Sequence, residues 1–276
     1  MNKDSVIHKL KNKSTELGIN YNEILSKFFF DEFLKQIANS VYRGNFILKG
    51  GLLLTYYLGI QNRTTKDIDF LFKKCQLEEA EIKKILKEVV GDNKQTNVWF
   101  ELNDTAKKIM PEDKYGGLSF HLVGHLANMK ASFNVDIAVG GPIYPLTTKK
   151  YSTILGDEIE LKMYPLELVL SEKLHAVLER AEKNSRSKDF YDIYTILKDK
   201  QEELNIKELK EAIAVTFGYR KTFISKNEAK DIINDINEDS LMRERWTNYQ
   251  KKHQYAKGID FSEITESINA LVDMSM

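Results

Sequence analysis

The sequence predicts an α+β fold in which a mixed β-sheet core with flanking helices is followed by a helical C-terminal half. Two features lead to this prediction: short apolar runs of strand length recur from Phe46 to about Tyr164, and apolar residues outside that range follow a helical spacing. The 276 residues, 42% of them hydrophobic, can bury the core of one large domain or of two closely packed ones. We place the boundary between residues 1–164, which hold the N-terminal helices and the sheet, and residues 165–276.

The elements can be assigned in chain order. The first forty residues are predicted to be helical because large apolar residues recur at helical spacing, namely Leu25, Phe29, Phe33 and Ile37. Five strand-like runs and one pair of runs around a turn signal follow, and a helix from Leu77 to Val90 interrupts them. The five runs are FILK, DIDFLF, NVWFEL, LSFHLVG and FNVDIAV, and the pair is STIL and IELKMY, which flank Gly156-Asp157. After Pro165 we expect only helices separated by polar loops.

Composition excludes several classes of protein. The 41 basic and 41 acidic residues balance, so no overall basic field indicates a nucleic-acid partner. A single cysteine, Cys75, excludes a disulfide framework and a cysteine-based zinc site and fits a reducing compartment. The polar N-terminus lacks the apolar core of a signal peptide, and no run approaches the roughly 20 apolar residues that span a bilayer. We therefore expect a cytoplasmic protein with no membrane partner.

Two acids interrupt the apolar run DIDFLF. On a strand, Ile68, Phe70 and Phe72 point to one face, whereas Asp67 and Asp69 share the other. Two carboxylates on one face repel each other and require a counter-charge. Mg²⁺ is the simplest one, because one or two carboxylates commonly hold it while water and substrate phosphates complete its coordination. The alternative is a pair of solvated acids at a strand edge, which is the commoner meaning of an isolated D-x-D.

The surrounding sequence favours a phosphate site. Gly50 and Gly51 follow the strand-like NFILK and open the apolar segment LLLTYYL, and a glycine turn at a helix N-terminus offers backbone N–H groups to a phosphate. No Gly-Lys-Ser/Thr follows, so the turn is not a Walker loop. A third acid, Asp136, lies in SFNVDIAVG with apolar neighbours on the opposite face. With Asp67 and Asp69 it makes a three-carboxylate set suited to two-metal phosphoryl chemistry.

This arrangement resembles the minimal nucleotidyltransferase core of the polymerase-β superfamily. More narrowly, LKGGLLLTYYLGIQNRTTKDIDFLF, from Leu48 to Phe72, resembles the opening motif of the AbiEii/AbiGii toxin family. The resemblance implies a nucleotidyltransferase-like fold and activity. That family usually carries Ser or Thr after the second glycine, where this chain has Leu52, so a hydroxyl that could meet a phosphate is missing. The phosphate contacts are then left to backbone groups and to bases such as Lys49 and Arg63.

The segment PLELVLSEKLHAVLER predicts an amphipathic helix with cations on its apolar face. Lys173 and Arg180 fall within the predicted apolar stripe, which consists of Leu166, Val169, Leu170, Ala176 and Val177. The residues expected outside the stripe are Glu167, Glu172, His175 and Glu179, and we expect His175 to be solvated. Buried cations need anions, which could be internal acids or the phosphates of a nucleotide, and long side chains can also reach solvent. Together with the D-x-D, these two cations favour a nucleoside triphosphate as the anion that they contact.

The segment RSKDFYDIYTIL carries a second resemblance. Arg186, Lys188 and Asp189 reproduce the R-x-K-D motif of the AbiEii/AbiGii toxins. Asp189 could be a helix N-cap; the resemblance implies instead a catalytic carboxylate that acts as a base or orients Lys173. Asp192, one turn further on, is expected to help position basic side chains. The resemblance extends over about residues 46–197.

A basic and aromatic segment lies near the C-terminus. Leu241–Gly258 contains five Lys or Arg residues and one acid, with Trp246, Tyr249 and Tyr255 between them. Basic side chains neutralise phosphates and aromatic rings stack on unpaired bases, so this segment could bind RNA. An amphipathic helix with its aromatic residues in the core and its charges solvated explains the pattern equally well.

Together these features predict a metal-dependent nucleotidyltransferase. The predicted catalytic residues are Asp67, Asp69, Lys173 and Asp189, with Mg²⁺ held by Asp67, Asp69 and Asp136. The nucleotide-binding residues are predicted to be Gly50, Gly51, Lys49, Arg63, Arg180, Arg186 and Lys188. The family resemblance implies a bacterial toxin that protects against phage by abortive infection, transfers NMP from an NTP to the 3′ end of a tRNA or other RNA, and pairs with a winged-helix antitoxin. The alternatives are transfer to a protein hydroxyl and a nucleotide-binding toxin that acts without catalysis.

Overall fold

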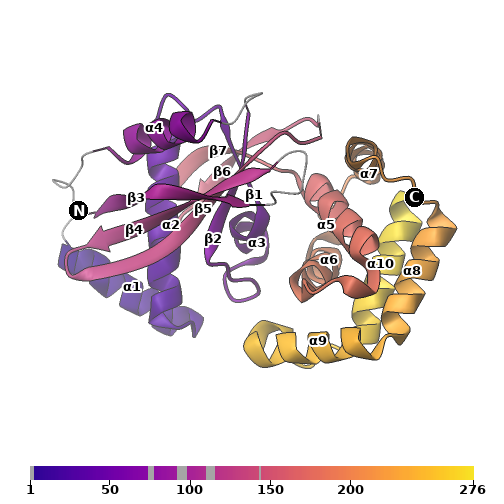
Figure 1. Cartoon of the computed structure of the whole chain (residues 1–276). Helices are drawn as coiled ribbons and strands as arrows, with labels where there is room; N and C mark the ends of the chain where they lie inside the picture. Colours follow the sequence, from indigo (N-terminus) through magenta and orange to yellow (C-terminus); the bar gives the residue numbers. More distant parts are fainter. Residues whose placement is uncertain (1–2, 74–77, 92–97, 110–115, 143) are drawn as a thin grey trace. The chain divides into compact units, whose positions relative to one another are not determined.

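The computed structural model describes residues 3–73, 78–91, 98–109, 116–142 and 144–276 of the chain (Figure 1). The chain divides into two compact units. The sheet unit comprises Met1–Gly140 and Leu146–Tyr164, and the helical unit comprises Gly141–Pro145 and Pro165–Met276. The single cysteine of the chain, Cys75, lies outside the described residues.

The sheet unit is built on a seven-stranded mixed sheet with the strand order β3-β4-β5-β2-β1-β7-β6. The pairs β1–β7 and β2–β5 are parallel, and the other neighbours are antiparallel. The mixed sheet that the sequence predicts is therefore confirmed. The strands are β1 (Phe46–Lys49), β2 (Asp67–Phe72), β3 (Val98–Ile109), β4 (Gly117–Leu126), β5 (Met129–Val139), β6 (Thr147–Ser152) and β7 (Glu158–Met163).

One strand differs from the prediction. The run STIL was expected to be a strand, but only Ser152 of that run belongs to β6, and the chain turns between Thr153 and Gly156. The strand itself is the polar segment TTKKYS, in which Tyr151 alone is buried. Because β6 is an edge strand of the sheet, most of its side chains meet water and leave no apolar alternation to detect.

Among the described residues four helices complete the sheet unit, and one of them, α2, packs on β5. The predicted stripe of Leu25, Phe29, Phe33 and Ile37 is buried on α2, at 5% exposure or less. The ring of Phe30 meets that of Phe133 on β5 edge-on, with 5.1 Å between centroids. The helices are α1 (Lys3–Leu17), α2 (Tyr21–Asn39), α3 (Gly50–Leu58) and α4 (Glu79–Val90). Leu77, the predicted start of α4, and Asn97, the predicted start of β3, lie outside the described residues.

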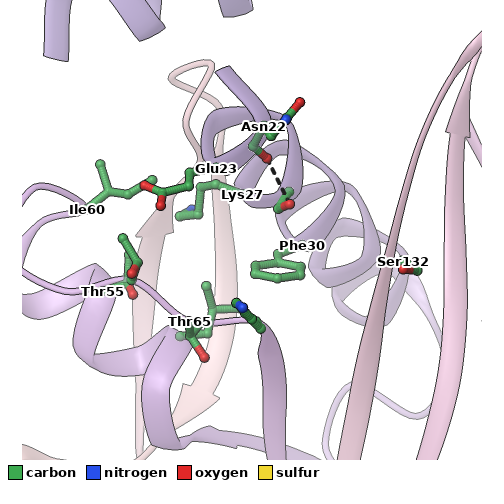
Figure 2. A pocket seen from close by; sticks show the side chains of 12 residues that line it. Asn22, Glu23, Lys27, Phe30, Thr55, Ile60, Thr65 and Ser132 are labelled. Atoms are coloured by element: carbon green, nitrogen blue, oxygen red, sulfur yellow. Dashed lines mark hydrogen bonds between the residues drawn. The ribbon is translucent and has the colours of Figure 1, made fainter. Parts of the chain in front are cut away.

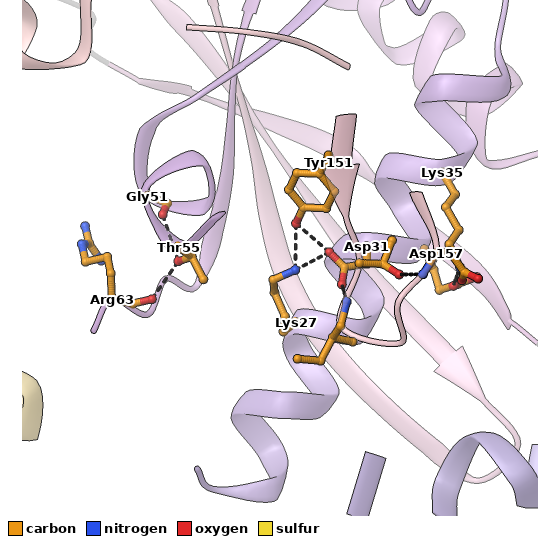
Figure 3. A network of polar contacts seen from close by, with 11 residues as sticks. Lys27, Asp31, Lys35, Gly51, Thr55, Arg63, Tyr151 and Asp157 are labelled. Carbon is orange, nitrogen blue, oxygen red and sulfur yellow. Dashed lines mark hydrogen bonds and ion pairs between the residues drawn. The ribbon is translucent and has the colours of Figure 1, made fainter. Parts of the chain in front are cut away.

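A buried polar network joins α2 to the far edge of the sheet (Figure 3). The Lys27 ammonium pairs with Asp31 and donates to the Tyr151 hydroxyl at 2.8 Å. Asp31 also accepts the backbone N–H of Ile154 at 2.6 Å, in the turn that follows β6. Burial and the Asp31 carboxylate raise the pKa of the Tyr151 phenol well above its usual value, so this hydroxyl stays protonated. The network satisfies a buried cation within the unit.

The helical unit contains no strand between residues 165 and 276, all of which the structure describes, and this confirms the prediction. Helix α10 packs against α6, α7 and α8, and α5 packs against α6, α7 and α8. The Tyr144 hydroxyl donates to the Glu208 carbonyl at 3.0 Å and attaches the segment before β6 to α7. The helices are α5 (Leu166–Arg180), α6 (Ser187–Lys200), α7 (Ile206–Arg220), α8 (Lys226–Glu238), α9 (Ser240–Lys252) and α10 (Phe261–Ser275).

The burial of α5 corrects the predicted stripe. His175 and Glu167, both expected on the polar face, are 4% and 6% exposed. The His175 ring bonds the Thr222 hydroxyl at 2.8 Å, and Glu167 accepts the Asn205 backbone N–H at 2.9 Å. Three helices surround α5, so its buried surface is wider than one apolar stripe, and polar residues enter it with hydrogen-bond partners.

None of the described helices is both long and apolar enough to cross a bilayer.

Candidate functional site

The D-x-D acids lie on strand β2 with their side chains on one face of the sheet. Ile68, Phe70 and Phe72 on the other face are buried, at 2% exposure or less, whereas Asp67 and Asp69 are half-buried. The alternation follows from the two-residue repeat of a strand that buries one face. The acids therefore remain accessible on a rigid central strand.

Strand pairing brings the third acid to the same place. Asp69 is the register partner of Asp136 on β5, so both side chains project from the same face. We call Asp67, Asp69 and Asp136 the strand carboxylates. Two neutral neighbours contact them: the Ser119 hydroxyl donates to Asp136 at 2.6 Å, and the Asn134 amide donates to Asp67 at 3.2 Å. Sequence reasoning missed both neighbours, because only the strand register identifies them.

The glycine turn is joined directly to the strand carboxylates. The Gly51 N–H, at the start of α3, donates to Asp69 Oδ2 at 3.1 Å. Gly50 has a φ of +64°, and a Cβ at this position would lie 2.0 Å from the same oxygen. Only glycine permits this approach. The positive end of α3 therefore faces Asp69, and one of the N–H groups predicted to bind phosphate already bonds a carboxylate.

Two predicted phosphate ligands lie beside this turn. The Arg63 guanidinium is 3.7 Å from the position of a Gly51 Cβ, and its side chain is largely buried. The Thr55 hydroxyl links the Gly51 and Arg63 carbonyls at 3.1 and 2.8 Å (Figure 3). Lys49 is the register partner of Asp69 on β1, and its ammonium lies 5.5 Å from the centre of the Tyr164 ring. The structure thus gathers Lys49, Arg63 and both glycines around Asp69.

Leu52, the departure from the family pattern, faces the interior. It is fully buried and lines a cavity of about 290 Å³ between α2, α3 and the segment before β2. Figure 2 shows Phe30 and Lys27 of α2 opposite Thr55 and Thr65 in this cavity. A hydroxyl at position 52 would therefore lie among these groups. The hydroxyl that lies against the turn belongs to Thr65, 2.6 Å from the position of a Gly51 Cβ, and sequence reasoning missed it.

A second polar cluster lies in the helical unit. The Lys173 ammonium is 2.9 Å from Asp189 Oδ1 and 2.6 Å from Asp192 Oδ2, and Arg186 Nε is 2.8 Å from Asp189 Oδ2. The two carboxylates are at most 1% exposed. Asp189 is not an N-cap, because α6 begins two residues earlier at Ser187. The cluster joins three predicted site residues with Asp192.

The protonation of Asp189 follows from this cluster. Burial alone would raise the pKa of its carboxyl, but the charges of Lys173 and Arg186 outweigh burial and hold that pKa below its usual value. A carboxylate with a depressed pKa and both oxygens in ion pairs is a weak base. Its geometry suits the second predicted role, which is to orient Lys173.

The remaining predicted residues lie outside this cluster. Arg180 is half-buried at the last position of α5, and Lys188 is exposed in the first turn of α6. Lys173 belongs to the helical unit and the strand carboxylates belong to the sheet unit, so their predicted convergence stays a prediction.

The aromatic residues of the Leu241–Gly258 segment divide between core and surface. Trp246 is 3% exposed and donates its indole N–H to the Ile259 carbonyl at 2.8 Å, so the core interpretation is correct for this residue. Tyr249 and Tyr255 are half-buried and pack against Tyr191. Lys251, Lys252 and Lys257 are exposed.

Two of the strand carboxylates have the chemistry of a magnesium site. Within the described ranges, no three His, Cys, Asp or Glu side chains are grouped so that they could hold a metal ion. Asp67 and Asp69 nevertheless offer hard oxygen ligands from one face of a strand, and Mg²⁺ typically takes one or two carboxylates and completes its shell with water and phosphate. The donor set fits an ion that binds together with a nucleotide. Asp136 as a third ligand stays a prediction.

Comparison with known proteins agrees with this geometry. A family model described as nucleotidyl transferase AbiEii toxin, type IV toxin–antitoxin system, matches residues 32–267. No curated protein sequence matches the chain. A crystal structure from Helicobacter pylori, provisionally described as a nucleotidyltransferase, aligns with a TM-score of 0.55 at 11% identity over 92% of this chain and 95% of its own. The structure of JHP933 from Helicobacter pylori aligns with a TM-score of 0.53 at 13% identity over 92% and 91%. At these identities the likeness shows a shared fold.

Proposed function

Because the chain belongs to the AbiEii family of nucleotidyl transferase toxins of type IV toxin–antitoxin systems, we propose that it transfers NMP from an NTP to the 3′ end of a tRNA. The observation that carries the proposal is the contact between the glycine turn and Asp69, which sets a helix N-terminus beside accessible carboxylates on a rigid sheet. Nucleotidyl transfer needs these two features together, one for the phosphates and one for their counter-ion.

The nucleotide would bind at the glycine turn. Gly50 and Gly51 would set the positive N-terminal end of α3 beside its phosphates, and Lys49 and Arg63 would supply positive charge next to them. The cations of the helical unit are proposed to hold the remaining phosphate charge, namely Lys173, Arg180, Arg186 and Lys188.

Asp67 and Asp69 would hold Mg²⁺, which when bound would neutralise charge on the phosphates, and Asp136 would be the third carboxylate of the site. In the transfer step the oxygen of the acceptor hydroxyl forms a bond to the α-phosphorus. The bond from that phosphorus to the oxygen bridging to the β-phosphate breaks, and pyrophosphate leaves. The hydroxyl proton passes to a site carboxylate, for which Asp136 is our choice because Asp189 is a weak base. Lys173, oriented by Asp189 and Asp192, stabilises the charge that develops.

The family also indicates the biological setting. We propose that the protein is the toxin of a pair that acts in the cytoplasm during abortive phage infection and that its antitoxin is a winged-helix protein. Coexpression of the toxin with its cognate winged-helix antitoxin should restore growth. Continued toxicity on coexpression would contradict this pairing.

The function is tested by incubating the purified protein with each NTP labelled at the α-phosphate, total tRNA and MgCl₂. We expect one NTP to label tRNA, and we expect Asp69→Asn, which keeps the size of the side chain, to abolish the labelling. Label on a protein substrate instead would favour the protein-hydroxyl alternative. If Asp69→Asn remains fully toxic in cells while wild type transfers nothing, the toxin acts by binding alone.

A further inference from the structure

The helical unit contains a basic pocket beside the Lys173 cluster, with which it shares Arg186. It has a volume of about 360 Å³ and lies between the segment that opens α6 and one side of α9. We call it the α6–α9 pocket. Its lining includes Arg186, Lys188, Arg245 and Lys252, and no acid is among the described residues that line it. Neither the family match nor the structural relatives assign a role to this pocket.

The pocket is held in shape by Arg245. Its Nη1 donates to the carbonyls of Glu182 and Asn184 at 2.6 and 3.2 Å, which fixes α9 against the turn before α6. Asn184 is fully buried and its side-chain oxygen accepts the Arg186 N–H at 2.8 Å, so the backbone that leads into α6 is fixed as well. The backbone that carries Arg186 and the side chain of Arg245 are therefore fixed at the hollow, and the exposed Lys188 and Lys252 complete its basic lining.

The charge of the pocket favours an anion. Four cations around one open hollow repel each other, and a ligand with negative charge relieves that repulsion. Helix α6 begins at Ser187, so its first N–H groups add positive potential at the same place. Arg186 contacts Asp189, and the charge of Lys188 also lowers the pKa of that carboxyl, so Arg245 and Lys252 supply the positive charge from the α9 side of the pocket.

The neutral lining indicates which anion. The remaining residues of the pocket are Ser185, Ser187, Asn248 and Tyr249. Arg, Lys, Ser, Asn and Tyr side chains together with a helix N-terminus are the groups that contact phosphate and sugar in protein–nucleic acid complexes. A nucleoside triphosphate has its own proposed site at the glycine turn of the sheet unit, and of the residues proposed to hold it only Arg186 and Lys188 also line this pocket. We propose that the α6–α9 pocket binds a backbone phosphate of the acceptor RNA. This inference rests on the proposed function, because it takes the acceptor to be an RNA.

The structure supplies a matched pair of variants for the test. Lys251 and Lys252 are consecutive, both are exposed and both lie in the last turn of α9, but only Lys252 lines the pocket. Changing either to Gln removes one positive charge from the same helix end, so any effect on the helix dipole is shared. A difference between the two variants therefore reports on the pocket.

Binding of fluorescently labelled total tRNA is measured by anisotropy over a series of salt concentrations. The loss of one phosphate contact should lower the log–log salt slope by about 0.7–0.9. At about 0.1 M salt this corresponds to roughly five- to eightfold weaker binding for Lys252→Gln. Lys251→Gln should stay close to wild type, and both variants should bind a non-hydrolysable NTP analogue with Mg²⁺ as wild type does.

Other results would overturn the inference. Equal tRNA affinities and salt slopes in Lys251→Gln and Lys252→Gln would show that the pocket holds no RNA phosphate. Weaker binding of the NTP analogue in Lys252→Gln, with unchanged tRNA binding, would assign the pocket to the triphosphate. The transfer assay on wild type separates these failures from failure of the proposed function. If wild type does not label tRNA but Lys252→Gln selectively weakens tRNA binding, the RNA-binding role of the pocket is supported and the proposed nucleotide transfer is contradicted.

Discussion

The acids of the two units differ in burial and in what they can contact. The strand carboxylates are half-buried on one face of the sheet, where a ligand can reach them. Asp189 and Asp192 are at most 1% exposed and pair with Lys173 and Arg186. Both groups stand in segments that resemble catalytic motifs, yet the sheet unit offers its acids to a ligand and the helical unit uses its acids to position cations. Substitutions in the two units should therefore have different consequences.

The largest difference is expected between Asp189→Ala and Asp69→Ala. Asp189→Ala should lower the free energy of unfolding by about 3 kcal/mol, the lower end of the range for breaking a buried ion pair, since Lys173 keeps Asp192. Asp69→Ala should change it by less than about 1 kcal/mol while nucleotide transfer is lost. Urea denaturation followed by circular dichroism gives the first quantity, and transfer to tRNA gives the second. Equal losses of stability in the two variants would remove the distinction between the units.

The glycine turn provides the next test, within the sheet unit. Gly50→Ala should cost roughly 2–3 kcal/mol, because its φ of +64° is unfavourable for alanine and the new Cβ would meet Asp69. Gly18→Ala is the matched control, because Gly18 has a φ of +65° and no atom within 4 Å of the added Cβ. It should cost about 1–2 kcal/mol and leave nucleotide binding intact.

Nucleotide binding by Gly50→Ala and Gly18→Ala tests whether the glycine turn belongs to the nucleotide site. Calorimetry with an NTP analogue should detect binding by Gly18→Ala and none by Gly50→Ala. If both variants bind the nucleotide as wild type does, the contact between the turn and Asp69 is not part of the nucleotide site.

Local patterns in the sequence predicted the helices and strands that bury one face and expose the other. Strand β2 is an example, because Asp67 and Asp69 alternate with Ile68 and Phe70 and this permits one orientation. The edge strand β6 was wrongly placed, because an exposed strand need not alternate. His175 was wrongly expected in solvent, because the sequence does not show that three helices enclose α5.

The site was predictable as a set of residues and not as a set of contacts. The acids and glycines stand out in the sequence, but the approach of Gly50 to Asp69 depends on the pairing of β1 with β2. From the sequence alone, Asp189→Ala is expected to retain the fold, because it would remove an unfavourable local electrostatic interaction. Its buried pairing with Lys173 and Arg186 leads to the opposite expectation. Long-range pairing, which no local pattern encodes, determines both outcomes.

The smallest effect should be a dependence of stability on pH that originates in the helical unit. His175 is enclosed by α5 and α7, with its ring edge-on to Phe217 at 5.2 Å between centroids. Burial lowers the pKa of its imidazole below the ordinary value of 6.5; Arg220 and Arg180 act in the same direction, and Glu179 and Glu172 oppose them.

The sign of the effect follows from that direction. Since the folded pKa is depressed, the unfolded chain binds more protons as the pH falls below 6.5. The contribution of His175 to the free energy of unfolding is therefore fully present above 6.5 and is lost as the pH falls through the folded pKa. His175→Gln cannot protonate and can still reach the Thr222 hydroxyl, so its stability should vary less with pH in this window.

Urea denaturation at closely spaced values from about pH 7.5 to about pH 5 measures the difference. His8→Gln, a change in an exposed residue of α1, controls for the loss of an imidazole. If His175→Gln and wild type lose stability in parallel across this range, the buried histidine is not the source of the pH dependence.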